Sequence, residues 1–155
     1  MVRGKISLMS KIMQQLIEMS HKAANKGEVP IAACIVDRDG NLIAMAHNRV
    51  EKRKDPTAHA EMVAIRLACK ARGEKYLMDC DLYVTLEPCA MCAQAISLAK
   101  LRRVYFGAYD AKGGGVEHGA RVFSHPTCHH APEVIGGMME AECAEPIKNF
   151  FADRR

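Results

Sequence analysis

Two short motifs have the residue types and the spacing of a catalytic zinc site. Residues 88–92 read Pro-Cys-Ala-Met-Cys, residues 59–61 read His-Ala-Glu, and each motif opens an apolar run typical of a helix. A catalytic zinc ion is held by three protein ligands and keeps its fourth position for water. His59, Cys89 and Cys92 supply one imidazole and two thiolates, which offset the charge of the ion. The spacing therefore predicts an open zinc site.

The helix starts also favour this chemistry. Cysteines three residues apart in one helical turn point the same way, so both sulfurs can reach one metal. Unpaired N–H groups and the positive end of the helix dipole favour a thiolate over a thiol. Pro88 suits the position before a helix, where its missing N–H costs nothing. Glu61 is placed to accept a proton from water that zinc has made more acidic, so we expect hydrolysis with Glu61 as the proton shuttle.

A closed, structural zinc site is the alternative to this interpretation. It would need a fourth protein ligand, such as His47, His125 or Cys128. The other thiols lack the spacing of a metal site or a disulfide framework, and we expect them to be small buried apolar residues.

The order of the elements is that of an α/β chain. Apolar periodicity predicts helices over residues 8–24, 58–72, 89–100 and 138–155, and strands over residues 31–36, 42–46, 81–86, 103–106 and 133–135. Ser7 or Ser10 is expected to cap the first helix, and Pro146 to kink the last one. A turn at residues 37–41 predicts an antiparallel pair. The strand–helix–strand order over residues 81–106 predicts a parallel pair.

Length and composition narrow the class of protein. The chain has 155 residues, of which 49% are hydrophobic, and this indicates one folded domain over residues 1–155. No apolar run approaches the roughly 20 residues of a membrane span, and we identify no signal peptide, so we expect a cytoplasmic protein with reduced thiols. The net charge is +4. Basic clusters at residues 52–54, 102–103 and 154–155 fit either a path for a phosphate backbone or a solvated surface.

The two motifs are part of a longer resemblance. His-x-Glu followed by Pro-Cys-x-x-Cys is the signature of zinc nucleobase deaminases. The chain resembles the bacterial tRNA adenosine deaminases, a branch of the cytidine-deaminase-like superfamily, and further matching segments are residues 27–30, 48, 55–61, 85–92, 106–108, 110–112 and 150–151. The resemblance implies a three-layer αβα fold with a mixed five-stranded sheet and helices on both faces. It also implies a homodimer with one Zn²⁺ per subunit that converts the wobble adenosine of a tRNA anticodon stem-loop into inosine.

The resemblance implies substrate contacts as well: Val29, Pro30, Asn48, Ala60, Asp110, Phe151 and Arg154. Asn48 would hydrogen-bond the flipped base, and its alternative role is turn chemistry in a loop. Asp110 would lie near the neighbouring nucleotide, or would simply cap its own loop. Phe151 could stack on a base, while one residue of the Phe150–Phe151 pair is expected in the core.

Some positions depart from the family pattern or leave alternatives open. Tyr109 stands where many relatives carry a basic residue, and Pro146 makes the placement of the last turn uncertain. Residues 110–132 form a long loop rich in glycine and histidine, which is usually functional at this length. Within it, we expect residues 128–130 to contact RNA or a second subunit rather than to hold a second metal.

Two other functions share the zinc motif or the fold. One is a deaminase of free guanine, cytosine or a nucleoside. The other is a catalytically silent RNA-binding subunit, against which the presence of Glu61 argues because such subunits would be expected to lose the shuttling carboxylate.

Overall fold

The computed structural model describes residues 2–154, and it describes side chains from residue 8 onward. The elements in chain order are α1 (Val2–Asn25), β1 (Ala32–Val36), β2 (Leu42–His47), α2 (Val50–Arg53), α3 (Ala60–Arg72), β3 (Asp81–Leu86), α4 (Ala90–Leu98), β4 (Arg103–Ala108), the 3₁₀ helix η1 (Val122–Ser124), β5 (Glu133–Ile135) and α5 (Glu140–Ala152). Among the described residues, no helix is both long and apolar enough to cross a membrane.

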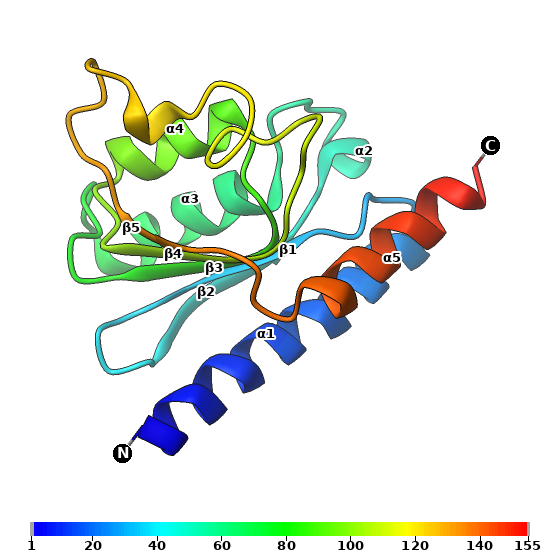
Figure 1. Ribbon diagram of the computed structural model, residues 1–155, viewed down its shortest axis with the longest axis horizontal. Helices are drawn as coiled ribbons and strands as arrows, with labels where there is room; N and C mark the ends of the chain where they lie inside the picture. The colour runs from blue at the N-terminus through cyan, green and yellow to red at the C-terminus, as the bar shows by residue number, and fades with distance from the viewer. Residues whose placement is uncertain (1, 155) are drawn as a thin grey trace.

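The strands form one mixed sheet in the order β2-β1-β3-β4-β5. β1 runs antiparallel to β2 and β3, whereas β3, β4 and β5 run parallel to one another. Helices α1 and α5 cover one face of the sheet, and α3 and α4 cover the other (Figure 1). The predicted three-layer αβα fold with a mixed five-stranded sheet is confirmed.

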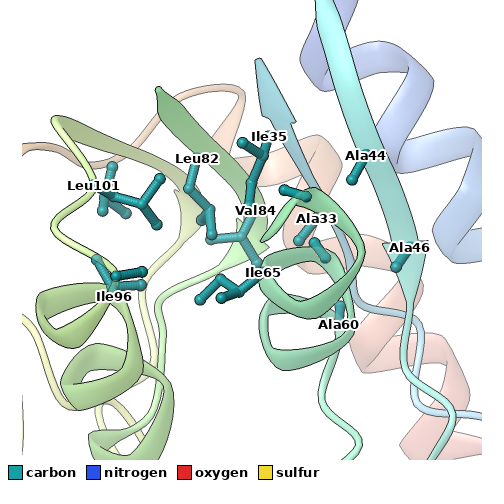
Figure 2. Close-up of a cluster of buried hydrophobic side chains, with 14 of the residues drawn as sticks. Ala33, Ile35, Ala44, Ala46, Ala60, Ile65, Leu82, Val84, Ile96 and Leu101 are labelled. Atoms are coloured by element: carbon teal, nitrogen blue, oxygen red, sulfur yellow. The ribbon is translucent and has the colours of Figure 1, made fainter. Parts of the chain in front are cut away.

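Alternating side chains of the central strands pack into two separate hydrophobic cores, one on each face of the sheet. Leu82 and Val84 point from β3 toward α3 and α4, where Ile65 and Ile96 meet them (Figure 2). Tyr83, between them in sequence, points to the opposite face and packs with the α1 and α5 layer. Successive strand residues face opposite ways, so a strand covered by helices on both faces must be apolar at nearly every position.

The turn between β1 and β2 is tight, as predicted. The N–H of Gly40 donates to the carbonyl of Asp37 at 3.0 Å, and the Asp37 carboxylate accepts the N–H groups of Asp39 and Asn41. Gly40 has a φ of +87°. The backbone of Asp39 does not enter the left-handed region, so glycine alone supplies the reversal.

The structure differs from the prediction at both ends of the chain and in the loop after β2. Helix α1 begins at Val2, so neither Ser7 nor Ser10 starts it. Serine favours a helix start without requiring one, and no proline blocks the preceding turn. The loop after β2 contains the short helix α2, which was not predicted. Helix α5 begins at Glu140, two residues later than predicted, and continues through Pro146; the kink expected at that proline stays a prediction.

Candidate active site

Four chain segments meet at one edge of the sheet. Ala32 at the start of β1 lies opposite His47 at the end of β2, and its N–H donates to the Thr85 hydroxyl near the end of β3. Leu86 at the end of β3 pairs with Ala108 at the end of β4. The segment before β1 and the segments after β2, β3 and β4 therefore converge. An edge where strands end is the usual place for a ligand site in an α/β sheet.

The three predicted zinc ligands lie together at this edge. His59 and Cys89 are the residues that precede the first turns of α3 and α4, and neither side chain caps its own helix. The Nδ1 atom of His59 lies 3.5 Å from the sulfur of Cys89 and 3.5 Å from that of Cys92. Zinc–nitrogen and zinc–sulfur bonds of about 2.0–2.3 Å at tetrahedral angles separate such atoms by about 3.5 Å. The residues present fit a zinc ion.

The ligand set is open. Within residues 2–154, His59, Cys89 and Cys92 are the one group of such side chains with the geometry to hold a metal. None of the candidates for a fourth ligand joins this group among the described residues. His47 Nδ1, His125 Nε2 and the Cys128 sulfur instead lie 2.7, 2.6 and 3.2 Å from backbone carbonyl oxygens. The described residues thus favour a catalytic site over a closed structural one.

The two thiols differ in charge state before a metal binds. A hydrogen bond from Cys92, reinforced by one from His59, lowers the pKa of Cys89 to about 4. The same bond to Cys89, together with burial, raises the pKa of Cys92. The bond to Cys89 also raises the pKa of His59. These shifts favour a thiolate at Cys89 and a thiol at Cys92 in the absence of metal, and a thiol must lose its proton to bind zinc.

Glu61 lies in the first turn of α3, with only 4% of its surface exposed. Burial raises the pKa of its carboxyl group to about 7. A carboxyl group with a pKa near the working pH can both accept and return a proton, which is the property a proton shuttle needs.

A cavity of about 400 Å³ opens beside the ligands. It is lined by Glu28, Val29, Ile31, Asn48, Val50, Glu51, Pro56, His59, Glu61, Leu86, Glu87, Cys89, Asp110 and Gly113. Ligand sites of small molecules have volumes of roughly 300–1,000 Å³, so a single base fits here. Of the predicted substrate contacts, Val29, Asn48 and Asp110 line the cavity. Pro30 and Ala60 are buried and do not line it.

Asn48 is anchored by one end of its amide. Its Oδ1 atom accepts the backbone N–H of Ala60 at 2.8 Å, and its own backbone N–H donates to the carbonyl of Ile31. The bond to Ala60 fixes the orientation of the side chain and leaves the Nδ2 hydrogens for a ligand. It also occupies the Ala60 N–H, which therefore cannot donate to a substrate.

A second hollow of about 390 Å³ shares Val29, Leu86 and Asp110 with the first. Its outer wall includes Tyr109 and Phe151, which are 42% and 47% exposed. Two exposed aromatic rings therefore line a hollow that adjoins the first cavity.

The end of α5 divides its aromatic residues between core and surface. Phe150 is 7% exposed and belongs to the core, as expected for one of the pair. The guanidinium of Arg154 lies 3.5 Å from the centre of the Phe150 ring and donates to the Phe150 carbonyl oxygen. Arg154 therefore folds back on its own helix. Arg155 lies outside the described residues.

The loop around residues 128–130 is fastened to α4. Ser97 donates to the carbonyl oxygen of His130 at 2.6 Å, and the sulfur of Cys128 lies 3.5 Å from the Ser97 hydroxyl. The Nε2 atom of His130 lies 2.7 Å from the carbonyl oxygen of Leu101. These contacts position the loop, while His129 stays exposed, and an RNA or subunit contact there remains a prediction.

Two buried acidic residues in the cavity wall were not predicted as site residues. The carboxylate of Glu28 accepts the N–H groups of Glu51 and Lys52 at the start of α2, both at 3.0 Å. The carboxylate of Glu87 accepts hydrogen bonds from backbone N–H groups of the loop after β4. The signal in the sequence was their position, because both lie in segments that resemble the family, and Glu87 stands between a predicted strand and the Pro88–Cys92 motif.

Known proteins place this geometry in a family. Residues 7–108 match the family described as the cytidine and deoxycytidylate deaminase zinc-binding region. A tRNA-specific adenosine deaminase of Agrobacterium fabrum is 52% identical over 143 residues, which cover 92% of this chain and 93% of that protein.

Solved structures of deaminases share this fold. One, described as a study of A-to-I editing by tRNA:A34 deaminases at the wobble position of transfer RNA, superimposes with a TM-score of 0.84 at 53% identity, covering 86% of this chain and 96% of that one. A guanine deaminase from Nitrosomonas europaea shares the fold, with a TM-score of 0.73 at 24% identity, covering 90% of this chain and 82% of that one. The chain belongs to the zinc-dependent cytidine and deoxycytidylate deaminase family, and within it to the tRNA-specific adenosine deaminases.

Proposed function

We propose that this protein hydrolyses the wobble adenosine of a tRNA anticodon loop to inosine and releases ammonia. The observation that carries the proposal is a buried glutamate, Glu61, beside an open three-ligand zinc site in a cavity large enough for one base. High identity to tRNA-specific adenosine deaminases over most of both chains supports adenosine in tRNA as the substrate.

His59, Cys89 and Cys92 hold the zinc ion in this proposal, one ion per subunit. When bound, zinc supplies a Lewis acid that lowers the pKa of water at the open position to about 7. The pairing of one imidazole with two thiolates keeps the site close to neutral before that water ionises.

Glu61 moves the protons. The oxygen of water adds to C6 of the adenine ring, while Glu61 takes a proton from this water and delivers it to N1. The hydroxyl group now on C6 loses its proton, which Glu61 passes to the exocyclic nitrogen; the bond from C6 to that nitrogen then breaks, C6 becomes a carbonyl carbon, and ammonia leaves. Because the carboxyl pKa lies near 7, Glu61 can both accept and return a proton at neutral pH.

The cavity walls orient the base. Asn48 donates from its Nδ2 group to an acceptor on the ring, and the apolar surface of Val29 packs against the ring face. Pro30 and Ala60 act from behind the wall, Pro30 by shaping the entry to β1 and Ala60 by anchoring Asn48. Asp110 lies where the first hollow joins the second, and it contacts a sugar hydroxyl of the neighbouring nucleotide because a phosphate would repel its charge.

The second hollow receives RNA beyond the target base. Phe151 stacks on a neighbouring base, and such stacking is worth about 1–3 kcal/mol per base. Tyr109, on the same wall, can stack in place of the basic residue found in many relatives. Arg154 contributes positive charge at this end of the molecule. An adenosine in an anticodon loop is already unpaired, so flipping it into the cavity costs at most a few kcal/mol.

We propose that residues 1–155 act as one catalytic domain, because the site residues lie at a single edge of the sheet.

We also propose a homodimer. The exposed apolar side chains Leu67 and Leu98 on the layer formed by α3 and α4 offer surface for a second copy. A tRNA substrate implies that the reaction takes place in the cytoplasm.

The test compares RNA with free small molecules. Zinc-loaded protein is incubated with an anticodon stem-loop that carries adenosine at the wobble position, and in parallel with free guanine, cytosine and adenosine. The proposal predicts inosine in the stem-loop and little ammonia from the free compounds. Turnover of a free base without any reaction on the stem-loop would overturn it.

A further inference from the structure

Glu87 is a buried charge that the deamination chemistry does not use. It stands two residues before Cys89, and 2% of its surface is exposed. Its two carboxylate oxygens accept hydrogen bonds from the loop after β4: from the backbone N–H groups of Asp110 (3.1 Å), Val116 (3.2 Å), Glu117 (3.0 Å) and His118 (3.1 Å), and the Nδ1 atom of His118 lies at 2.8 Å. One side chain therefore organises a loop that lacks strands of its own.

Backbone contacts extend the same attachment to the zinc motif. The N–H of Gly115 donates to the carbonyl of Pro88 at 2.8 Å, and the N–H of Gly114 donates to that of Asp110. A side chain at Gly114 would collide with the Glu87 carboxylate, and one at Gly115 would lie 2.5 Å from the backbone nitrogen of Ala90. The glycine run permits this close approach between the loop and the start of α4.

The attached loop forms a wall of the cavity. Asp110 and Gly113 line it together with Glu87 itself, and Asp110 also lines the second hollow. The Oδ1 atom of Asp110 in turn accepts the N–H of Gly113 at 2.8 Å, so the turn moves as one unit with Asp110. The place of this wall relative to the zinc ligands is thus set by the bonds to Glu87.

We propose that Glu87 is a positioning residue for RNA binding: it holds the segment from Asp110 to His118 against the zinc motif so that the cavity and the second hollow keep the shape that the substrate nucleotides require. The expected effect on RNA binding rests on the proposed function, whereas the contacts between Glu87 and the loop do not depend on it. Glu87 is not one of the three metal-binding side chains, and both of its carboxylate oxygens bond to the loop, so its effect passes through Asp110.

The principal variant is Glu87→Gln. The amide keeps the size of the side chain but turns one oxygen into a donor, which then faces N–H groups that need an acceptor. The matched control is Glu117→Gln, which removes the same charge from an exposed side chain of the same loop. In Glu87→Gln, KM for the stem-loop rises about tenfold or more, while kcat stays within about threefold and zinc stays at one per chain. Glu117→Gln behaves as the unchanged protein does.

Two substitutions at His118 test the same contact with Glu87 if Glu87→Gln folds poorly. The side-chain nitrogen of asparagine can occupy the place of the histidine Nδ1 atom, so His118→Asn keeps the donor and a KM near that of the unchanged protein. His118→Leu removes the donor and raises KM. Equal KM values in these two variants would contradict the proposal, and so would a Glu87→Gln protein that loses zinc or kcat instead of affinity.

Amide hydrogen exchange without RNA separates this proposal from the proposed function. The amides of Asp110, Val116, Glu117 and His118 exchange about tenfold faster or more in Glu87→Gln, while those of α1 keep their rates. This result stands even if the unchanged protein fails to deaminate the stem-loop. Unchanged exchange in the loop would overturn the positioning role, whatever the activity.

Discussion

The Oδ1 atom of Asn48 accepts a hydrogen bond from the backbone N–H of Ala60 at 2.8 Å. This bond joins the segment after β2 to the first turn of α3, the same turn that carries Glu61 and follows the ligand His59. One amide side chain therefore links the segment proposed to recognise the base with the start of the helix that carries Glu61.

Replacing Asn48 separates its two tasks. Asn48→Asp keeps an oxygen for the Ala60 N–H but cannot donate to a base, so we expect full zinc content with KM raised about 10- to 100-fold. Asn48→Ala loses both bonds, and we expect the same loss of affinity with the free energy of unfolding lowered by about 1–3 kcal/mol. Stem-loop kinetics and thermal unfolding check this. A normal KM in Asn48→Asp would remove Asn48 from base recognition.

The neighbouring phenylalanines of α5 should respond in opposite ways. Phe151→Ala leaves stability nearly unchanged, because the side chain is half exposed, but weakens stem-loop binding by about 1–3 kcal/mol through the lost stack. Phe150→Ala opens a cavity in the core and lowers the free energy of unfolding by about 3–5 kcal/mol. Equilibrium binding and denaturant titration distinguish the two. If Phe151→Ala binds the stem-loop normally, the second hollow does not hold a stacked base.

Removing zinc should expose one reactive thiolate. The pKa of Cys89 lies at about 4, so this sulfur stays ionised at pH 6, where an ordinary thiol is almost fully protonated. We expect iodoacetamide at pH 6 to modify Cys89 first in metal-free protein, and stoichiometric zinc to protect it. Peptide mapping by mass spectrometry identifies the modified residue.

Cys34 and Cys143 serve as internal controls in the same experiment. Burial raises the pKa of each thiol to about 12, so both remain protonated and unreactive while the protein is folded. Modification of Cys34 or Cys143 at the rate of Cys89 would mean that metal removal had unfolded the protein. Slow modification of Cys89 under conditions where the fold persists would contradict the thiolate assignment.

The sequence predicted the parts of the fold and site whose signals are local. The bounds of β3 and β5, the turn after Asp37 and the end of α3 at Arg72, just before a glycine, each follow from a strand pattern or a residue with special backbone freedom. The ligand triad was predictable because spacing within two helix starts defines it, and the three atoms do lie together.

What escaped prediction depends on partners distant in the sequence. Helix α2 has four residues, of which only Val50 is apolar, too few to show a helical pattern in the sequence. The backbone N–H groups of its first turn donate to the carboxylate of Glu28, which lies more than 20 positions earlier in the sequence. No local pattern reveals such a contact. The role of Glu87 is hidden for the same reason, since its donors come from an irregular loop. Helix α5 continues past the buried Pro146, and the kink expected there from the residue type alone stays a prediction.

Glu61→Gln under single-turnover conditions tests the central claim most directly. The substitution keeps the shape of the side chain and removes its ability to accept a proton, with the zinc content of each sample measured alongside. The account predicts one zinc per chain, normal binding of the stem-loop, and inosine formation slower by roughly 10²- to 10⁴-fold. A zinc-loaded Glu61→Gln protein that forms inosine at close to the unchanged rate would contradict it.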